Sequence, residues 1–271
     1  MTAPRLHVEI DGDGPPLVLL HGWAMHGGVF EPLVARLRRH HRVHVVDLPG
    51  HGGSRDSGVP LALDACVDAI AAQVPAAPWC GWSLGGLVAL QAAATRPEAV
   101  PRLAMLCASP RFVRGDGSGG APAWRWGMSA QIFRDFADGL RDDYRGTLDR
   151  FIALEAFGSD DARGDLRALR AQLFARGEPA AHVLADGLHL LETVDLRDRL
   201  PRLRVPSLWI AGRRDRLVDP RAMRETAAMA AGATFVQVEH GGHAPFLTHA
   251  DDVASALHDF AVGVVPTAPS P

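Results

Sequence analysis

The feature of this 271-residue chain that most constrains its fold is a hydrophobic run that breaks at one serine and resumes at once. In "PWCGWSLGGLVAL", residues 78–90, Gly81 and Gly85 stand two residues on either side of Ser83. The run before Ser83 is typical of a buried strand, and the run after it, which ends at Pro97, is typical of a helix. Because an abrupt strand-to-helix turn leaves no room for neighbouring side chains, the pattern predicts a serine hydroxyl that is lifted clear of a sheet and into a cleft.

Strand-like and helical segments alternate on both sides of this turn. Strands are expected at 15–22, 41–52, 78–82, 100–110, 205–212 and 233–243, and helices at 29–40, 63–74, 84–97 and 251–261. From about 124 to 193 the signals are helical only. This alternation predicts an α/β fold with a mostly parallel, doubly wound sheet.

The interruption of the alternation predicts how the chain is divided. Residues 1–110 and 196–263 are expected to form two parts of one α/β core. Residues 111–195 are expected to be a helical lid over the C-terminal edge of the sheet, and residues 264–271 a loose tail.

Charge and composition exclude several classes of protein. A net charge of −3 gives no reason to expect a nucleic-acid or membrane-surface partner. No apolar run approaches the ~20 residues of a membrane span, and the N-terminal stretch lacks the apolar core of a signal peptide. Three scattered cysteines favour neither disulfides nor a metal site. We therefore expect a cytoplasmic monomer that needs no metal and no organic cofactor.

A serine hydroxyl is a weak nucleophile, so it needs a base, and the base needs an acid to orient it. In this architecture the acid and the base follow the serine in that order. The loop after the strand at 205–212 offers Asp215 or Asp219 as the acid. We favour Asp215, because Asp219 precedes Pro220 and fits a helix cap better.

The base is expected in the loop that follows the last strand. His243 lies there, in a glycine-flanked turn. His240 at the strand end and His249 before the last helix are competing candidates, but both fit structural or surface roles better.

Two backbone N–H groups are expected to stabilise a developing oxyanion. One is that of Leu84, at the start of the helix after Ser83, and the other is that of Trp23, in the turn after the first strand. His21 and Gly22 let the backbone approach closely there, and His21 is expected to be a buried histidine that shapes the turn rather than a catalytic group.

Five segments together resemble the α/β-hydrolase superfamily over about residues 15–260. They are "LVLLHGW", "VVDLPGHGGSR", "GWSLGGLVAL", "DRLV" and "GGHAPFLTH". More narrowly, "RFIALE", "GLHLLETVDLR" and "HAPFLTH" are similar to the family of pimeloyl-[acyl-carrier protein] methyl ester esterases of biotin synthesis. The resemblance implies a Ser83–His243–Asp215 triad.

The same resemblance implies how a substrate would be held. Trp23 and Phe151 would line the acyl pocket. Arginines of the lid would hold the phosphate-bearing acyl-carrier protein, and the matching positions here are Arg150, Arg163 and Arg167. Because Arg163 and Arg167 fall four residues apart on one helix face, they fit a dock for an acidic carrier.

Several observations keep other functions open. One arginine of the family is replaced by Gly146, with Arg145 beside it. Between residues 111 and 176 there are 11 arginines against 10 acids, so the lid arginines also fit an ordinary solvated face. The alternatives are a generalist carboxylesterase or lipase-like hydrolase of short esters, a carbon–carbon bond hydrolase, and a non-catalytic ligand-binding protein on the same fold.

Overall fold

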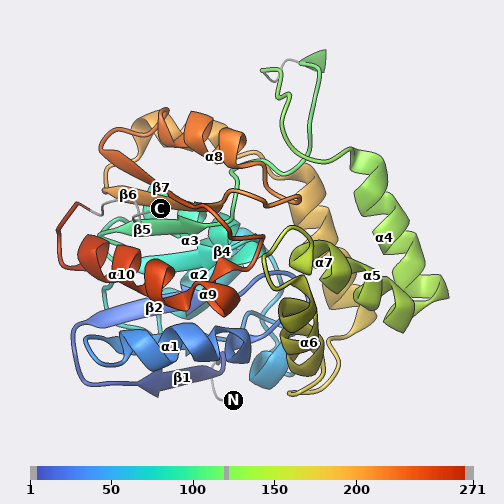
Figure 1. Ribbon diagram of the computed structural model, residues 1–271, viewed down its shortest axis with the longest axis horizontal. Helices are drawn as coiled ribbons and strands as arrows, with labels where there is room; N and C mark the ends of the chain where they lie inside the picture. The colour runs from blue at the N-terminus through green and yellow to red at the C-terminus, as the bar shows by residue number, and fades with distance from the viewer. Residues whose placement is uncertain (1–4, 119–121, 266–271) are drawn as a thin grey trace.

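The computed structural model describes residues 5–118 and 122–265. One sheet runs through the core in the strand order β1-β3-β2-β4-β5-β6-β7 (Figure 1). The strands are β1 (Val8–Asp11), β2 (Pro16–Leu20), β3 (Arg42–Val46), β4 (Trp79–Trp82), β5 (Leu103–Leu106), β6 (Ser207–Gly212) and β7 (Ala233–Val238). All neighbouring strands are parallel except β1, which pairs antiparallel with β3. The prediction of a mostly parallel, doubly wound sheet is confirmed.

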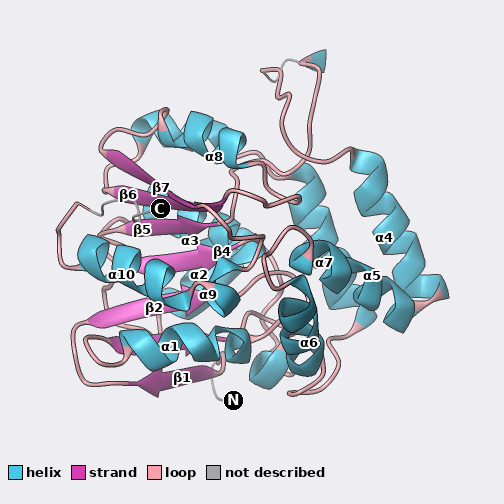
Figure 2. Ribbon diagram, viewed as in Figure 1, coloured by secondary structure: helices cyan, strands magenta, loops and turns pink. Residues whose placement is uncertain are grey.

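Helices cover both faces of this sheet (Figure 2). The core helices are α1 (Glu31–Leu37), α2 (Leu63–Ala71), α3 (Leu84–Thr95), α8 (Pro220–Ala227), α9 (Pro245–Thr248) and α10 (Ala250–Ala261). Helices α1 and α10 pack together in front of the sheet in Figure 1, α2 and α3 pack together behind it, and α8 packs on β6 and β7. Short 3-10 helices lie at η1 (Gly27–Phe30), η2 (Gly52–Ser54) and η4 (Arg197–Arg202).

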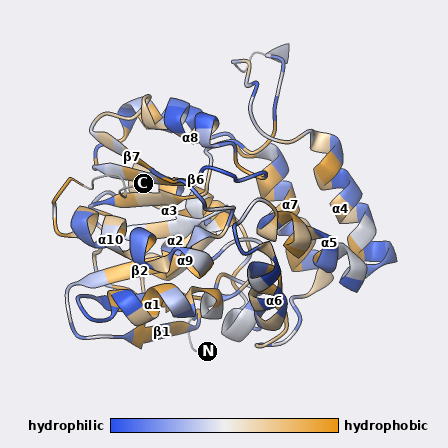
Figure 3. Ribbon diagram, viewed as in Figure 1, coloured by the Kyte–Doolittle hydropathy of each residue, from blue (hydrophilic) through white to orange (hydrophobic). Residues whose placement is uncertain are grey.

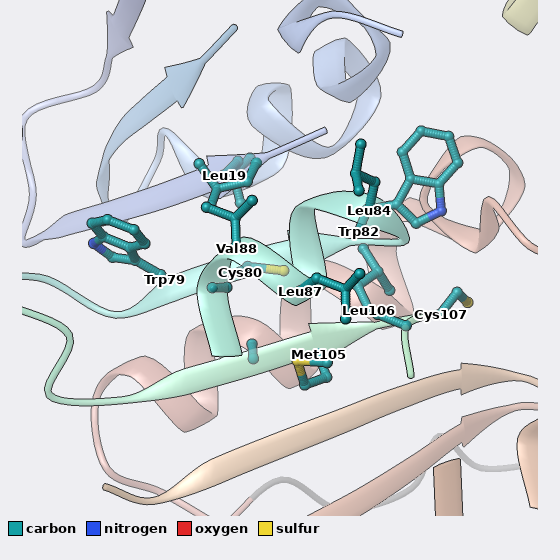
Figure 4. Packing of buried hydrophobic residues seen from close by; sticks show 14 of the residues in the cluster. Leu19, Trp79, Cys80, Trp82, Leu84, Leu87, Val88, Met105, Leu106 and Cys107 are labelled. Carbon is teal, nitrogen blue, oxygen red and sulfur yellow. The ribbon is translucent and has the colours of Figure 1, made fainter. Parts of the chain in front are cut away.

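Helix α3 is buried on every side over most of its length, because it begins at the centre of the sheet. Apolar side chains of α3, including Leu87 and Val88, pack beside Leu19 of β2 and Met105 of β5 (Figure 4). A helix that is apolar all round is stable only when it is surrounded by protein. This packing fixes the N-terminal end of α3, and with it Ser83, against the sheet.

The lid region consists of four helices between β5 and β6. They are α4 (Ala130–Asp142), α5 (Tyr144–Ala156), α6 (Ala162–Leu173) and α7 (Ala181–Thr193). Figure 3 shows these helices with alternating apolar and polar stripes, whereas the strands of the core are mostly apolar. Such stripes are typical of surface helices that bury one face only.

Two hydrogen bonds show where the lid helices sit. The Trp23 indole Nε1 donates to the Leu184 carbonyl of α7 over 2.8 Å, and His26 Nε2 donates to the Gln172 carbonyl of α6 over 2.7 Å. Trp23 and His26 follow β2, so the helices cover the C-terminal ends of the parallel strands. The boundaries 111 and 195 of the lid stay a prediction, and residues 266–271 of the predicted loose tail lie outside the described residues.

Candidate active site

Ser83 occupies a sharp turn between β4 and α3. Its backbone has φ 53° and ψ −118°, a conformation that is costly for any residue other than glycine. A Cβ on Gly81 would lie 2.2 Å from the Gly85 carbonyl oxygen, and one on Gly85 would lie 2.4 Å from the Leu20 carbonyl oxygen. Both flanking glycines are therefore required by space, which confirms the reason for the G-x-S-x-G spacing.

The acid and base loops meet beside this turn. Nδ1 of His243 lies 2.8 Å from Oδ2 of Asp215, and both side chains are buried. The other oxygen, Oδ1, accepts the backbone N–H groups of Leu217 at 2.8 Å and Val218 at 2.9 Å. Three hydrogen bonds thus fix the direction of the Asp215 carboxylate.

The second ring nitrogen of His243 is free. Because Nδ1 must carry the proton that it donates to a carboxylate, Nε2 of the neutral ring has a lone pair to accept another proton. Nε2 is buried and has no hydrogen-bond partner among residues 5–118 and 122–265. Burying a nitrogen without a hydrogen-bond partner lowers the stability of the folded protein, so its presence here points to a functional role.

Trp82, the residue before Ser83, connects the serine turn to the loop that carries His243. The Trp82 indole Nε1 donates to the His243 carbonyl over 2.8 Å, and the two rings lie 5.6 Å apart between centroids. In the described part of the chain, the Ser83 hydroxyl and His243 make no hydrogen bond to each other.

The two predicted oxyanion donors lie on either side of Ser83. Leu84 is the first residue of α3, so its N–H has no hydrogen-bond acceptor within the helix. A Cβ on Gly22 would lie 3.2 Å from Cβ of Ser83, which places the turn that carries Trp23 against the serine. Neither the Trp23 nor the Leu84 backbone N–H donates to another described residue.

An aromatic cluster connects this turn to the lid. The rings of Trp23 and Phe151 lie 4.5 Å apart in an edge-to-face arrangement, and Phe136 of α4 lies 5.8 Å from Phe151. Phe151 is buried in α5, whereas Phe157 is 58% exposed. Trp23 from the core and Phe151 from the lid therefore form one aromatic contact between these two parts of the chain.

The predicted carrier arginines differ in their contacts. Arg150 is exposed but engaged, because it contacts the Asp143 carboxylate over 3.3 Å and the Thr147 hydroxyl over 2.6 Å. Arg163 and Arg167 are exposed on α6 and form no ion pair with any described residue. Arg145, beside Gly146, pairs with Glu178.

The residues rejected as acid and base have structural contacts. Asp219 caps α8 by accepting the Arg221 backbone N–H over 2.8 Å, and His240 lies on the surface 3.2 Å from Asp160. His21 is buried and accepts the Leu48 N–H over 2.8 Å. These contacts confirm the cap and the turn-shaping histidine.

Two groups near the acid were not predicted from the sequence. Glu155 of α5 is buried, its carboxylate oxygens have no partner among the described residues, and its pKa is raised well above the ordinary value by burial and then by the charge of Asp215. Cys107 follows β5 with φ 43°, and its Sγ accepts the Gly212 N–H over 3.4 Å. Burial, followed by the charge of Asp215, also raises the pKa of the Cys107 thiol.

Residues 5–118 and 122–265 contain no group of three or more His, Cys, Asp and Glu side chains that is arranged to hold a metal ion. None of the helices there is long and apolar enough to cross a membrane. Cys66, Cys80 and Cys107 are all buried.

The fold and the turn at Ser83 define a class of protein. Residues 15–250 match the family described as alpha/beta hydrolase fold. An esterase from Exiguobacterium antarcticum superposes with a TM-score of 0.82 at 23% identity, covering 95% of this chain and 96% of that chain. The enol-lactonase from Burkholderia xenovorans LB400 gives 0.81 at 24% identity, with the same two coverages. At these identities the two structures establish the fold alone.

Sequence relatives narrow the class. A protein of Xanthomonas campestris named pimeloyl-[acyl-carrier protein] methyl ester esterase is 58% identical over 255 residues, which is 94% of this chain and 98% of that protein. A protein of Stenotrophomonas maltophilia with the same name is 54% identical over 261 residues, 96% of this chain and 98% of that protein. This chain belongs to the α/β-hydrolase-fold family and, within it, to the family of these carboxylic ester hydrolases. The predicted family and enzyme class are confirmed.

Proposed function

We propose that this protein hydrolyses the methyl ester of a pimeloyl group carried by an acyl-carrier protein, releasing the free carboxylate and methanol for biotin synthesis. The names of the relatives support the substrate. The observation that carries the chemistry is the buried Asp215–His243 hydrogen bond, which leaves His243 Nε2 without a hydrogen-bond partner among the described residues. Trp82, which precedes the strained Ser83, packs against the same His243 ring.

The first half of the reaction forms an acyl-enzyme. His243 Nε2 takes the Ser83 hydroxyl proton while Oγ bonds to the ester carbonyl carbon. The negative charge moves to the carbonyl oxygen, where the N–H groups of Trp23 and Leu84 stabilise it. The bond from carbon to methoxide then breaks, and methanol leaves with the proton that His243 held.

The second half restores the enzyme. Water bonds to the acyl carbon as His243 takes one of its protons, and the same oxyanion site receives the charge. The bond to Ser83 Oγ breaks and the serine regains its proton. The sum is one ester and one water converted to one carboxylic acid and one alcohol. Asp215 keeps the His243 ring in one orientation through both halves, because its other oxygen is fixed by the Leu217 and Val218 N–H groups.

The lid is expected to select the substrate. The scissile ester is at the far end of the acyl chain from the carrier, so a long apolar chain must pass between lid and core while the carrier stays outside. Trp23 and Phe151 supply an apolar wall for that chain. Arg163 and Arg167 are free to bind an anionic carrier, and Arg150 would have to leave Asp143 to do so. We propose that the enzyme acts as a monomer.

The direct test is to compare two substrates with purified protein. Methanol release is measured from pimeloyl methyl ester linked to its carrier and from methyl butyrate, a short free methyl ester. We expect kcat/KM to be at least about 10-fold higher for the carrier-linked ester, equivalent to 1.4 kcal/mol of carrier binding. Equal values would indicate a generalist carboxylesterase, and no reaction with either would indicate a ligand-binding protein.

A genetic test asks whether the reaction serves biotin synthesis. The gene is introduced into a strain that lacks its own methyl esterase and cannot grow without biotin. We expect growth to be restored by the wild-type gene and not by Ser83→Ala. Restored growth with both would contradict the proposed mechanism.

A further inference from the structure

The outer face of α5 carries apolar side chains near its C-terminal end. Leu154 is 37% exposed and Phe157, directly after the helix, is 58% exposed. The opposite side of the same turns is buried against the rest of the protein, through Phe151, Ile152 and Ala156 and the carboxyl group of Glu155. A solvated helix face is normally polar, so exposed apolar residues at this place indicate a contact surface.

Helix α6 lies beside this apolar face. The Arg170 guanidinium contacts the Asp149 carboxylate over 2.9 Å, and this pair fixes the register of the antiparallel α5–α6 hairpin. Because the two helices run in opposite directions, residues of α5 after Asp149 lie beside residues of α6 before Arg170. The turns that carry Leu154 and Phe157 therefore lie next to the half of α6 that carries Arg163 and Arg167.

A third arginine reaches the same corner from the core. The Arg216 guanidinium lies 5.8 Å from the centre of the Phe157 ring, in a cation–π contact. Arg216 is exposed and pairs with no carboxylate among the described residues. Because it directly follows Asp215 in the chain, the apolar face of α5 adjoins the loop that carries the proposed catalytic acid.

The carboxylates at this corner are already engaged. Asp160 pairs with Arg214 and lies 3.2 Å from His240, and Asp161 caps α6 by accepting the Gly164 N–H over 2.8 Å. The charge that remains available to a partner is therefore positive, next to an exposed aromatic ring.

We propose that Leu154, Phe157 and Arg216, together with Arg163 and Arg167, form one docking surface for the acidic acyl-carrier protein, here called the α5–α6 corner. This inference rests on the proposed function and extends its carrier site from α6 to α5 and the acid loop. The arginines attract the anionic carrier and set its orientation, and burial of Leu154 and Phe157 supplies the apolar part of the contact. In this position the bound carrier contacts Arg216, which directly follows the proposed catalytic acid Asp215.

The test compares corner variants on two substrates. Phe157→Ser, Leu154→Ser and Arg216→Gln are each assayed with carrier-linked pimeloyl methyl ester and with methyl butyrate. We expect each variant to lower the ratio of the two kcat/KM values by about 5- to 10-fold, through a higher KM for the carrier-linked ester. Arg42→Gln is the matched control, because Arg42 is exposed at the first residue of β3, at the opposite end of the parallel strands.

The outcomes separate this inference from the proposed function. If Arg163→Glu with Arg167→Glu lowers the ratio while all three corner variants leave it unchanged, the corner is wrong and the carrier site on α6 stands. If the wild-type protein does not prefer the carrier-linked ester, the proposed function itself fails. Sedimentation provides a further check, since a dimer that dissociates on Phe157→Ser would identify a second copy of the chain as the occupant and overturn the proposal.

Discussion

The acid and base loops of the core and the α5–α6 hairpin of the lid use charged side chains in opposite ways. In the core, Asp215 and His243 are buried, and each hydrogen bond fixes the direction of a charge or a lone pair. On the hairpin, Arg163 and Arg167 are exposed and pair with no described residue. The Asp215 and His243 side chains are bound by the protein itself, whereas Arg163 and Arg167 are available to a partner.

The core site is built mainly by backbone turns, whereas the proposed lid site is built by exposed side chains. The core site depends on turns that tolerate little change, such as the position of Gly85, where a Cβ would meet the Leu20 carbonyl at 2.4 Å. The lid site depends on exposed side chains that can be exchanged with little effect on folding. Core variants should therefore affect every ester alike, and lid variants should affect only esters on a carrier.

The largest effect is expected from removing the nucleophile. Ser83→Ala should lower kcat by between about 10³- and 10⁶-fold for both carrier-linked and free esters, because the hydroxyl forms the covalent bond. Substrate binding, measured by titration of the variant with carrier-linked ester, should persist. A loss of less than about 10-fold would remove Ser83 from the mechanism.

A smaller loss is expected from the acid. Asp215→Asn should lower kcat by up to about 10⁴-fold on both esters, because an amide cannot hold His243 in the Nδ1-protonated form. Asp219→Asn is the control, since asparagine caps a helix about as well as aspartate. Steady-state rates that fall equally in the two variants would contradict the choice of Asp215.

An effect confined to one substrate is expected on the lid. Arg163→Glu combined with Arg167→Glu should lower kcat/KM for the carrier-linked ester by about 10-fold or more, through charge repulsion, and spare methyl butyrate. In the wild-type protein the same rate should fall as salt rises from low ionic strength to 0.5 M. Equal losses on both esters would show that these arginines act on the fold rather than on docking.

The last effect concerns the free energy of unfolding and its pH dependence, and it leaves the chemical step unchanged. The pKa of Glu155 is raised by burial, so the folded protein keeps a proton that the unfolded chain releases above its ordinary pKa of 4.5. Folding stability is then lost as pH rises from 4.5 toward the raised value, at up to about 1.4 kcal/mol per pH unit. Glu155→Gln cannot ionise, so its stability relative to wild type should increase with pH.

Urea unfolding between pH 4.5 and pH 8 measures this difference. Glu98→Gln is the matched control, because Glu98 is exposed and should show no such slope. A constant difference between Glu155→Gln and wild type across this pH range would mean that Glu155 is ionised in the folded protein.

Much of the fold could be predicted from the sequence, because buried parallel strands appear as continuous apolar runs. Six strands and the helices α1, α2 and α3 lie within the predicted ranges, and α10 begins one residue before its range. β1 was missed because it is a four-residue edge strand, largely exposed and without such a run. α8 was missed because its eight residues are polar on their outer face and begin directly after the acid loop.

The candidate site divides in the same way. The proximity of Asp215 and His243, and the position of Ser83 at the same edge of the sheet, could be expected from chain order, because the C-terminal ends of parallel strands meet at one edge of the sheet. Glu155 and Cys107 could not be found, since nothing in their neighbouring residues shows that they face the acid loop. Their environment depends on how α5 and the end of β5 pack in three dimensions.

The most direct test of the central claim is reaction of the protein with an activated phosphonate, followed by mass spectrometry. We predict one covalent adduct per chain, located on Ser83, and lost both in Ser83→Ala and after acid denaturation before labelling. An unchanged mass, or an adduct on a different residue, would contradict the account.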